Sequence, residues 1–365
     1  MVTTTVGIAF SGKIREKINK KGWFGNKNQL QAIVEPENSG TEIAEQSNQE
    51  NNDIAVQDGS VSTQSVDTSN WDLTKVDIVY DTANVAVPVP KGYVASGADG
   101  EHTVNTGFVI YEGDIAVTTA NAWSESCTRN QWVWVPVENI SKYCESVDSG
   151  VAVTGSTVTT KKYTKSLIEI GTGNNKTTII RGLPSSNSYR EPTLLDADYD
   201  SDANAKKAGF TDANDMATKM VREYETMIKS IEKYGGFYIG RYELSGTVDN
   251  PTEKTGATIT SKTWYELYNA CKKIGSKSDG SDKEGIATRM IWGCQWDATC
   301  DFIATKGEQK SIKDSSTWGN YANYNTSNSY TEGTTGYVKD AGTKQDTGTS
   351  EYWKANNIYD IAGNC

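Results

Sequence analysis

Histidine is almost absent from this sequence: His102 is the only one in 365 residues. Histidine is the side chain most used for proton transfer near neutral pH and a common zinc ligand, so its scarcity argues against those chemistries. His102 stands in a Gly/Asp/Thr-rich stretch, and we interpret it as a solvated turn residue. The six cysteines show no C-x-x-C spacing, so we expect neither a structural zinc site nor a disulfide scaffold.

Long apolar runs and positive charge are also scarce. No run of about 18 apolar residues occurs, so we expect no transmembrane helix. The net charge of −11 disfavours a nucleic-acid partner, because binding to phosphates needs a basic face. Five lysines and arginines do lie within residues 13–21, with Ile14 and Ile18 four positions apart. This basic N-terminal segment is either an amphipathic stretch in weak contact with an anionic membrane surface or a short solvated helix.

The first 72 residues have little with which to build a core. From Glu35 to Asp72 there are nine acidic residues, no Lys or Arg, and few large apolar residues other than Trp71. Such a segment cannot bury enough apolar surface to offset its ordering entropy. We therefore expect residues 1–72 to be disordered, residues 73–130 to form short strands, and residues 131–365 to form one domain. A long acidic spacer with few cysteines favours the outside of a bacterial cell, as an extracellular or cell-surface protein.

Strand and helix patterns alternate irregularly after residue 75. Runs of β-prone residues occur at 76–80, 85–90, 107–111, 131–137 and 237–243. Apolar residues at helical spacing predict a helix over 215–234, ended by Gly235-Gly236, and another that starts near Ser261 or Thr263 and runs to Ile274. Within 295–303, Trp296, Cys300 and Ile303 also share a helical face. Residues 150–215 are polar, and we interpret them as long loops or insertions; we interpret residues 306–350 as a loop. Short strands, few helices and long loops together predict an α+β fold.

Six short segments in the second part of the chain stand in the same order as the motifs of a known protein family. They read Q-W-V-W-V-P-V at 131–137, F-Y-I-G-R-Y-E at 237–243, W-Y-E-L at 264–267 with Cys271, R-M-I-W-G-C-Q-W-D-A at 289–298, W-G-N at 318–320, and Y-D-I-A-G-N at 359–364. In this order they resemble the formylglycine-generating-enzyme (sulfatase-modifying factor) family. The resemblance covers about two thirds of the chain and implies the compact, loop-rich, C-type-lectin-like α+β fold of that family.

The departures from the family pattern concern its chemistry. The family continues after A-G-N with V-W-E-W, an R-G-G-S segment and the cysteine pair that binds copper and performs the oxidation, whereas this chain ends at Cys365. The resemblance is thus to a C-terminally truncated domain in which no cysteine stands at a copper-binding position. We expect no copper site, since soft thiolates are the ligands that would hold Cu(I).

Calcium is the cofactor that the resemblance leaves open. By motif position, Asp360 would supply a carboxylate to one calcium ion, and Gly363 and Cys365 would supply main-chain oxygens. Asn323 and the carbonyl of Tyr324 would contribute to a second site. Calcium takes six to eight oxygen ligands, so both sets are partial. The alternative is that both stretches are ordinary turns.

Two functions fit the sequence. The first is a non-catalytic recognition module for an unknown ligand or protein, because loops rich in Tyr, Trp, Asn and Thr suit adaptable polar and aromatic contacts. The second is a fragment of a formylglycine-generating oxidoreductase that oxidises a cysteine of a sulfatase. The absence of the thiol pair from its expected positions favours the first.

Overall fold

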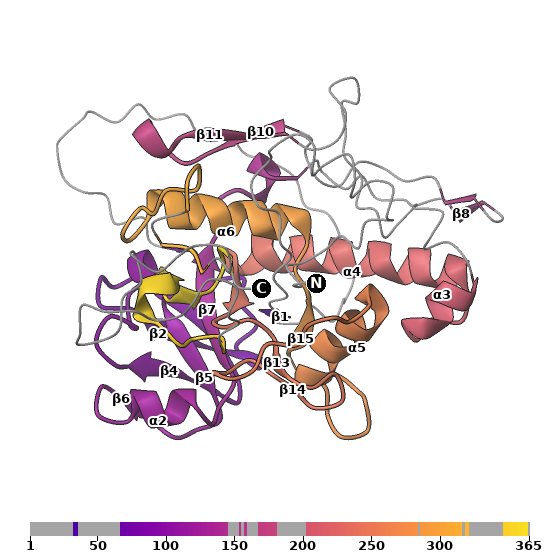
Figure 1. Ribbon diagram of the computed structural model, residues 1–365, viewed down its shortest axis with the longest axis horizontal. Coiled ribbons are helices and arrows are strands. Elements are labelled where there is room, and N and C mark those ends of the chain that lie inside the picture. Colours follow the sequence, from indigo (N-terminus) through magenta and orange to yellow (C-terminus); the bar gives the residue numbers. More distant parts are fainter. Residues whose placement is uncertain are drawn as a thin grey trace.

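A computed structural model of the chain describes residues 32–35, 66–144, 153–154, 157–158, 167–180, 202–283, 285–315, 318–320 and 346–363. These residues form a mixed α+β structure with one large sheet, several two-stranded sheets and few helices (Figure 1). In the described part of the chain, no helix is long and apolar enough to cross a membrane.

The large sheet has seven strands among the described residues, in the order β15-β1-β12-β7-β5-β4-β6. Its strands are β1 (Ala32–Glu35), β4 (Tyr93–Gly97), β5 (Val109–Glu112), β6 (Val117–Thr118), β7 (Gln131–Pro136), β12 (Gly236–Gly240) and β15 (Ala287–Met290). The pairings are antiparallel except for that of β4 with β6. The central pair β7–β12 is buried along almost its whole length, with Phe237 opposite Val135 and Tyr238 opposite Trp134.

The remaining strands form five separate pairs. They are β2 (Val76–Tyr80) with β3 (Ala86–Pro90), β8 (Val153–Thr154) with β9 (Thr157–Val158), β10 (Leu167–Ile170) with β11 (Thr177–Ile180), β13 (Ser245–Gly246) with β14 (Pro251–Thr252), and β16 (Lys354–Ala355) with β17 (Ile358–Tyr359). All five are antiparallel. β3 contains Pro88 and Pro90, and proline is tolerated in such a pair because only one side of the strand needs its N–H groups.

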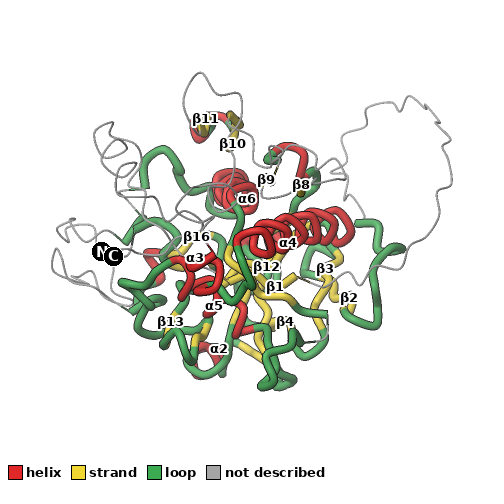
Figure 2. The backbone as a smooth tube through the Cα atoms, turned by 90° about the vertical axis from the view of Figure 1, so that its right-hand side faces the viewer, coloured by secondary structure: helices red, strands yellow, loops and turns green. Residues whose placement is uncertain are grey.

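The helices are α2 (Ala122–Ser126), α3 (Asp202–Lys207), α4 (Ala213–Tyr234), α5 (Trp264–Ile274) and α6 (Gly293–Thr305), with 3₁₀ turns η1 (Val104–Thr106), η2 (Ile140–Lys142), η3 (Gly173–Asn175) and η5 (Glu351–Trp353). α4 and α6 run next to each other over the same side of the strands, where α4 packs on β12 and α6 on β7 (Figures 1 and 2). α5 packs against β15 and β1 at the opposite end of the sheet from β6.

The two long amphipathic helices agree with the sequence predictions. α4 begins after Asp212, whose side chain accepts a hydrogen bond from Asp215 N at 2.8 Å, and ends at Gly235 in the left-handed region (φ 78°). α5 begins with a capping box between Thr263 and Glu266, and its buried face includes Cys271. Burial raises the pKa of that thiol well above its ordinary value, which fits a packed small hydrophobe.

Two parts of the chain differ from the expected organisation. Residues 150–215 were expected to be long loops or insertions, and the loop prediction is wrong for the β8–β9 and β10–β11 pairs and for α3. β1 was not anticipated at all, although it lies within the large sheet between β12 and β15. It belongs to the segment 1–72, the rest of which lies outside the described residues except for 66–72.

Candidate functional site

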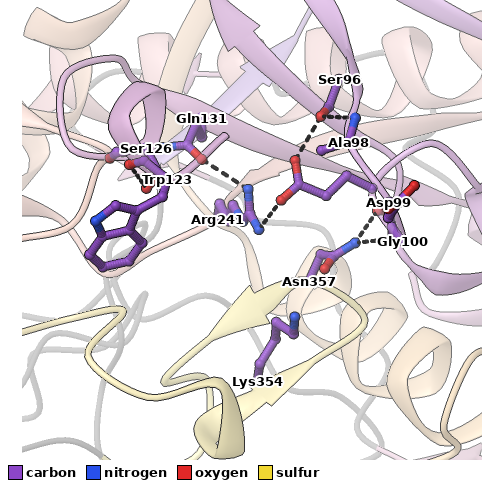
Figure 3. A network of polar contacts seen from close by, with 12 residues as sticks. Ser96, Ala98, Asp99, Gly100, Trp123, Ser126, Gln131, Arg241, Lys354 and Asn357 are labelled. Carbon is purple, nitrogen blue, oxygen red and sulfur yellow. Dashed lines mark hydrogen bonds and ion pairs between the residues drawn. The ribbon is translucent and has the colours of Figure 1, made fainter. Parts of the chain in front are cut away.

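A network of buried polar and charged groups surrounds Arg241, the residue that follows β12. Because β12 pairs with β7, Arg241 lies beside Gln131 at the start of β7. Its guanidinium donates from Nη2 to Glu101 Oε1 at 2.5 Å and from Nη1 to Gln131 Oε1 at 3.0 Å and Tyr111 Oη at 2.9 Å. The Glu101 carboxylate also accepts from Ser96 Oγ at 2.7 Å and from Tyr111 Oη at 3.1 Å. Figure 3 shows Arg241 directed between Gln131 and the turn that carries Asp99 and Gly100.

Two tyrosine rings cover the other side of this ion pair. Tyr242 and Tyr359 stack with their centroids 4.9 Å apart, and the Arg241 guanidinium lies 5.7 Å and 5.5 Å from the respective rings. Burial raises the pKa of Tyr242 to about 12 against the opposing effect of Arg241, and burial raises that of Tyr359 well above its ordinary value. Both phenols are therefore neutral at physiological pH and act as packing and hydrogen-bonding groups.

Tyr359 brings the C-terminal segment, defined as residues 346–363, onto this centre. Its N–H donates to the Arg241 carbonyl at 2.8 Å, and its hydroxyl is hydrogen-bonded to Glu351. Glu351 also forms an ion pair with Lys354. Burial tends to raise the pKa of Glu351, but Lys354 and Tyr359 outweigh it and the pKa is lowered, so the carboxylate is charged.

The turn of the β16–β17 hairpin is made by two asparagines with positive φ, Asn356 at 48° and Asn357 at 64°. This pair of left-handed residues matches the turn type that the twist of a two-residue hairpin favours. Asn357 Nδ2 donates to the carbonyls of Gly100 at 2.8 Å and Gly107 at 2.7 Å. Figure 3 shows Asn357 directed at Gly100. A side chain at position 107 would overlap the Asn356 carbonyl, so a glycine is needed there.

Asp360, the candidate calcium ligand, is fully buried and holds three segments together. Its Oδ1 accepts from Asn320 Nδ2 at 3.0 Å, and its Oδ2 accepts from Thr347 Oγ1 at 2.9 Å and Gly348 N at 2.8 Å. Thr347 Oγ1 in turn accepts from Glu243 N at 3.0 Å. The carboxylate therefore links the segment after β12 to both sequence motifs near the C-terminus.

Gly363 lies where those two motifs meet. Asn320 N donates to the Ala362 carbonyl at 2.7 Å, and Asn320 forms a parallel bridge with Gly363. Gly363 has φ 93°, and a Cβ there would overlap the backbone of Asn320, so both its conformation and its close approach require glycine.

The other proposed calcium ligands, Cys365, Asn323 and Tyr324, lie outside the described residues. Of the two calcium sets, the structure thus shows only Asp360 and Gly363, which lie at the same junction. The residues that the structure describes contain no cluster of three or more His, Cys, Asp or Glu side chains able to hold a metal ion.

His102, expected to be a solvated turn residue, is half-buried against the turn that contains Gly100 and Glu101. Its Nδ1 lies 2.6 Å from the Ser96 carbonyl oxygen, its Nε2 lies 3.1 Å from that of Tyr80, and its ring packs against Phe108 at 4.9 Å. It therefore contributes to holding the Glu101 turn in place and is not simply solvated.

The described cysteines do not form a thiol pair. Cys144, Cys271 and Cys294 are buried, Cys300 is half-buried, and Cys127 is exposed after α2; none of these five is in a disulfide. The Cys144 thiol donates to the Ile140 carbonyl at 3.3 Å and Cys294 accepts from the Tyr224 hydroxyl at 3.6 Å. Two of the buried thiols thus have a hydrogen-bonding role in packing.

One corner of the molecule presents apolar side chains to solvent. Trp123 on α2 is 69% exposed and Ile115, in the loop between β5 and β6, is 60% exposed. Arg129 Nη1 donates both to the Ile115 carbonyl at 2.9 Å and to Glu125 of α2 at 3.1 Å, so one nitrogen links the loop to the helix. Figure 3 shows the Trp123 indole extending away from the Arg241 network. We call Ile115 and Trp123, with the α2 and loop backbone that carries them, the α2 corner.

No known family model matches the chain, and no curated protein and no solved structure was found to be similar to it. The mixed α+β architecture therefore rests on the structure itself.

Proposed function

We propose that this chain is a non-catalytic recognition module built on a scaffold like that of the formylglycine-generating-enzyme domain, with its C-type-lectin-like arrangement. The segments that carry the resemblance lie against one another, which supports this fold. The first and second form the antiparallel β7–β12 pair, and the W-G-N and Y-D-I-A-G segments meet at Asn320 and Gly363. A recognition module of this kind fits a protein displayed on a bacterial cell surface.

The functional proposal rests on one contrast: the buried charged side chains are hydrogen-bonded within the fold, whereas large apolar side chains are exposed at the α2 corner. Arg241, Glu101 and Asp360 are enclosed and engaged in hydrogen bonds within the fold, as expected of structural charges. The α2 corner instead exposes an indole and an isoleucine on a backbone held by Arg129. Tryptophan offers a large contact area at a low entropic cost, and it is enriched among residues that dominate binding energy.

The binding test compares the intact chain with Trp123→Ala and Ile115→Ser on a panel of immobilised glycans and peptides. Leu73→Ala is the matched control, because Leu73 is also an exposed apolar residue but belongs to another segment, the turn before β2. We expect at least one ligand to be retained by the control and weakened tenfold or more by Trp123→Ala, since a central contact residue contributes 2 kcal/mol or more, with about 1.4 kcal/mol per tenfold.

The competing function is tested on the same preparation. The chain is incubated with a C-x-P-x-R peptide, copper and oxygen, and the peptide is examined by mass spectrometry. We expect no conversion of its cysteine above a blank without protein. Conversion would overturn the proposal in favour of the oxidoreductase, and equal binding by the wild type and the Trp123 variant would move recognition away from the α2 corner.

A further inference from the structure

The large sheet contains a position that only a separate strand fills. β12 and β15 do not pair with each other, and β1 lies between them. Ile33 and Val34 are opposite Ile239 and Tyr238 of β12, while Ala32 to Glu35 are opposite Met290 to Ala287 of β15. We call this position between β12 and β15 the strand slot.

An empty strand slot would be costly. Every residue of β12 is buried, and so are Ala287, Thr288 and Met290 of β15. Without β1, backbone groups of both strands would lose their partners in a buried setting, and each such loss costs on the order of 1–3 kcal/mol. The fold therefore requires a strand at this position. The β1 segment of the same chain and the β1 segment of a second copy meet this requirement equally well.

The connection to the rest of the molecule does not dictate which chain supplies it. Thirty residues, 36–65, separate Glu35 from the next described residue, Val66. Because this connection is long, nothing in its length forces β1 to pair with its own sheet. An exchanged β1 makes the same contacts in a second copy as in its own, so exchange has almost no enthalpic penalty.

We propose that the strand slot is an exchange site, which the β1 segment of a second copy of this chain enters in place of the resident one. Joined to its own sheet through 30 residues, the resident strand has an effective concentration on the order of 1 mM. At a protein concentration of ~10 μM, the unexchanged monomer therefore prevails about 100-fold. The exchanged dimer becomes a major species where copies are crowded to about 1 mM, as in an array on a surface.

Disulfide trapping tests the exchange in the full-length chain. Ala32 and Met290 are direct partners across β1 and β15, so cysteines there are placed to cross-link. One chain carries Ala32→Cys and the other Met290→Cys, both with Cys127→Ser and Cys365→Ser. A chain with both new cysteines should close an internal disulfide. The mixture should give a heterodimer whose initial yield rises about tenfold for a tenfold rise in concentration.

A mismatched pair and a proline variant make the result specific. Ala32→Cys mixed with Lys206→Cys, an exposed position on α3, should give at least tenfold less heterodimer. Adding Val34→Pro to the donor should reduce trapping at least tenfold, because proline lacks the N–H that a central strand donates, whereas Val34→Thr should retain it.

If the Met290 variant fails to fold, Glu35→Cys and Ala287→Cys form a second opposed pair. Internal closure without any heterodimer at ~0.5 mM over several days would overturn the exchange. Failure of both pairs to close internally in folded protein would overturn the strand slot itself. These outcomes do not depend on the α2 corner. Failure of the strand exchange and failure of the proposed recognition function are therefore distinguished by separate experiments.

Discussion

Replacing Asp360 by asparagine removes a charge without changing the size or the backbone preference of the residue. Asp360 has φ 55°, and asparagine adopts this left-handed region as readily as aspartate. Donors meet both of its carboxylate oxygens: Asn320 Nδ2 at Oδ1, and Thr347 Oγ1 with Gly348 N at Oδ2. Whichever way the asparagine amide is turned, its NH₂ group faces at least one of those donors. The loss of charged acceptors and one unsatisfied buried donor together predict a cost of about 3 kcal/mol.

The cost is measured by urea unfolding and by thermal melting of Asp360→Asn, in calcium and in chelator. We expect a midpoint lowered by about 6–12 °C, given about 2–4 °C per kcal/mol for a folded unit of this size. Asp346→Asn is the control, because Asp346 is exposed in the same segment and should change stability by less than about 0.5 kcal/mol. A loss below 1 kcal/mol would refute the hydrogen-bonding role. A loss seen only in calcium would show that Asp360 acts as a calcium ligand instead.

Four further outcomes follow from the same site. Gly363→Ala should lower stability by at least about 2 kcal/mol in urea, because it adds a clash to an unfavourable φ. Arg241→Met should lower the free energy of unfolding by about 3–5 kcal/mol, because it leaves the Glu101 carboxylate buried without its partner. In a double-mutant cycle, adding Glu101→Leu should restore most of this stability. Raising the pH from 10 to 12 should lower the free energy of unfolding, because the raised pKa of Tyr242 makes its stabilising contribution complete below pH 10 and lost as pH rises through about 12. Urea unfolding at the two pH values measures this loss, and absorbance at 295 nm reports the ionisation of tyrosine. Calcium at ~1 mM should add only about 0.4 kcal/mol for a Kd on the order of 10⁻³ M, so a melting shift of ten degrees would contradict this partial site.

Helical periodicity and cap residues predict the bounds of α4 and α5 within about two residues. In α4 the spacing of Met216, Met220 and Tyr224 reflects a real buried face, and Gly235 ends the helix in the left-handed conformation expected of a residue after the last turn. In α5, Thr263 caps as its hydroxyl chemistry suggests. Such features are local, so one stretch of sequence contains all the information that determines them.

The parts that sequence reasoning missed depend on contacts between distant residues. β1 is only four residues long, and its pairing with strands about 200 to 260 positions away leaves no periodic signal in residues 32–35. The pairing of Arg241 with Glu101 joins residues 140 positions apart. The sequence does contain one signal for this ion pair: the apolar strand β12 is followed directly by Arg241. An arginine next to buried strand residues needs a carboxylate partner. That signal identifies the need for a partner but not the partner.

In the C-terminal segment, the described residues of the Y-D-I-A-G motif each have a role in the fold. In Y-D-I-A-G, Tyr359 covers the buried Arg241, Asp360 accepts hydrogen bonds from Asn320 and from Thr347 and Gly348, and Gly363 permits the close approach of Asn320. Each of these roles stabilises the fold and none requires a bound metal or a reactive thiol. The motif therefore predicts architecture more strongly than activity. For this chain the functional question moves to the residues that the fold does not need, and Trp123 on the α2 corner is the most exposed large apolar side chain among those described.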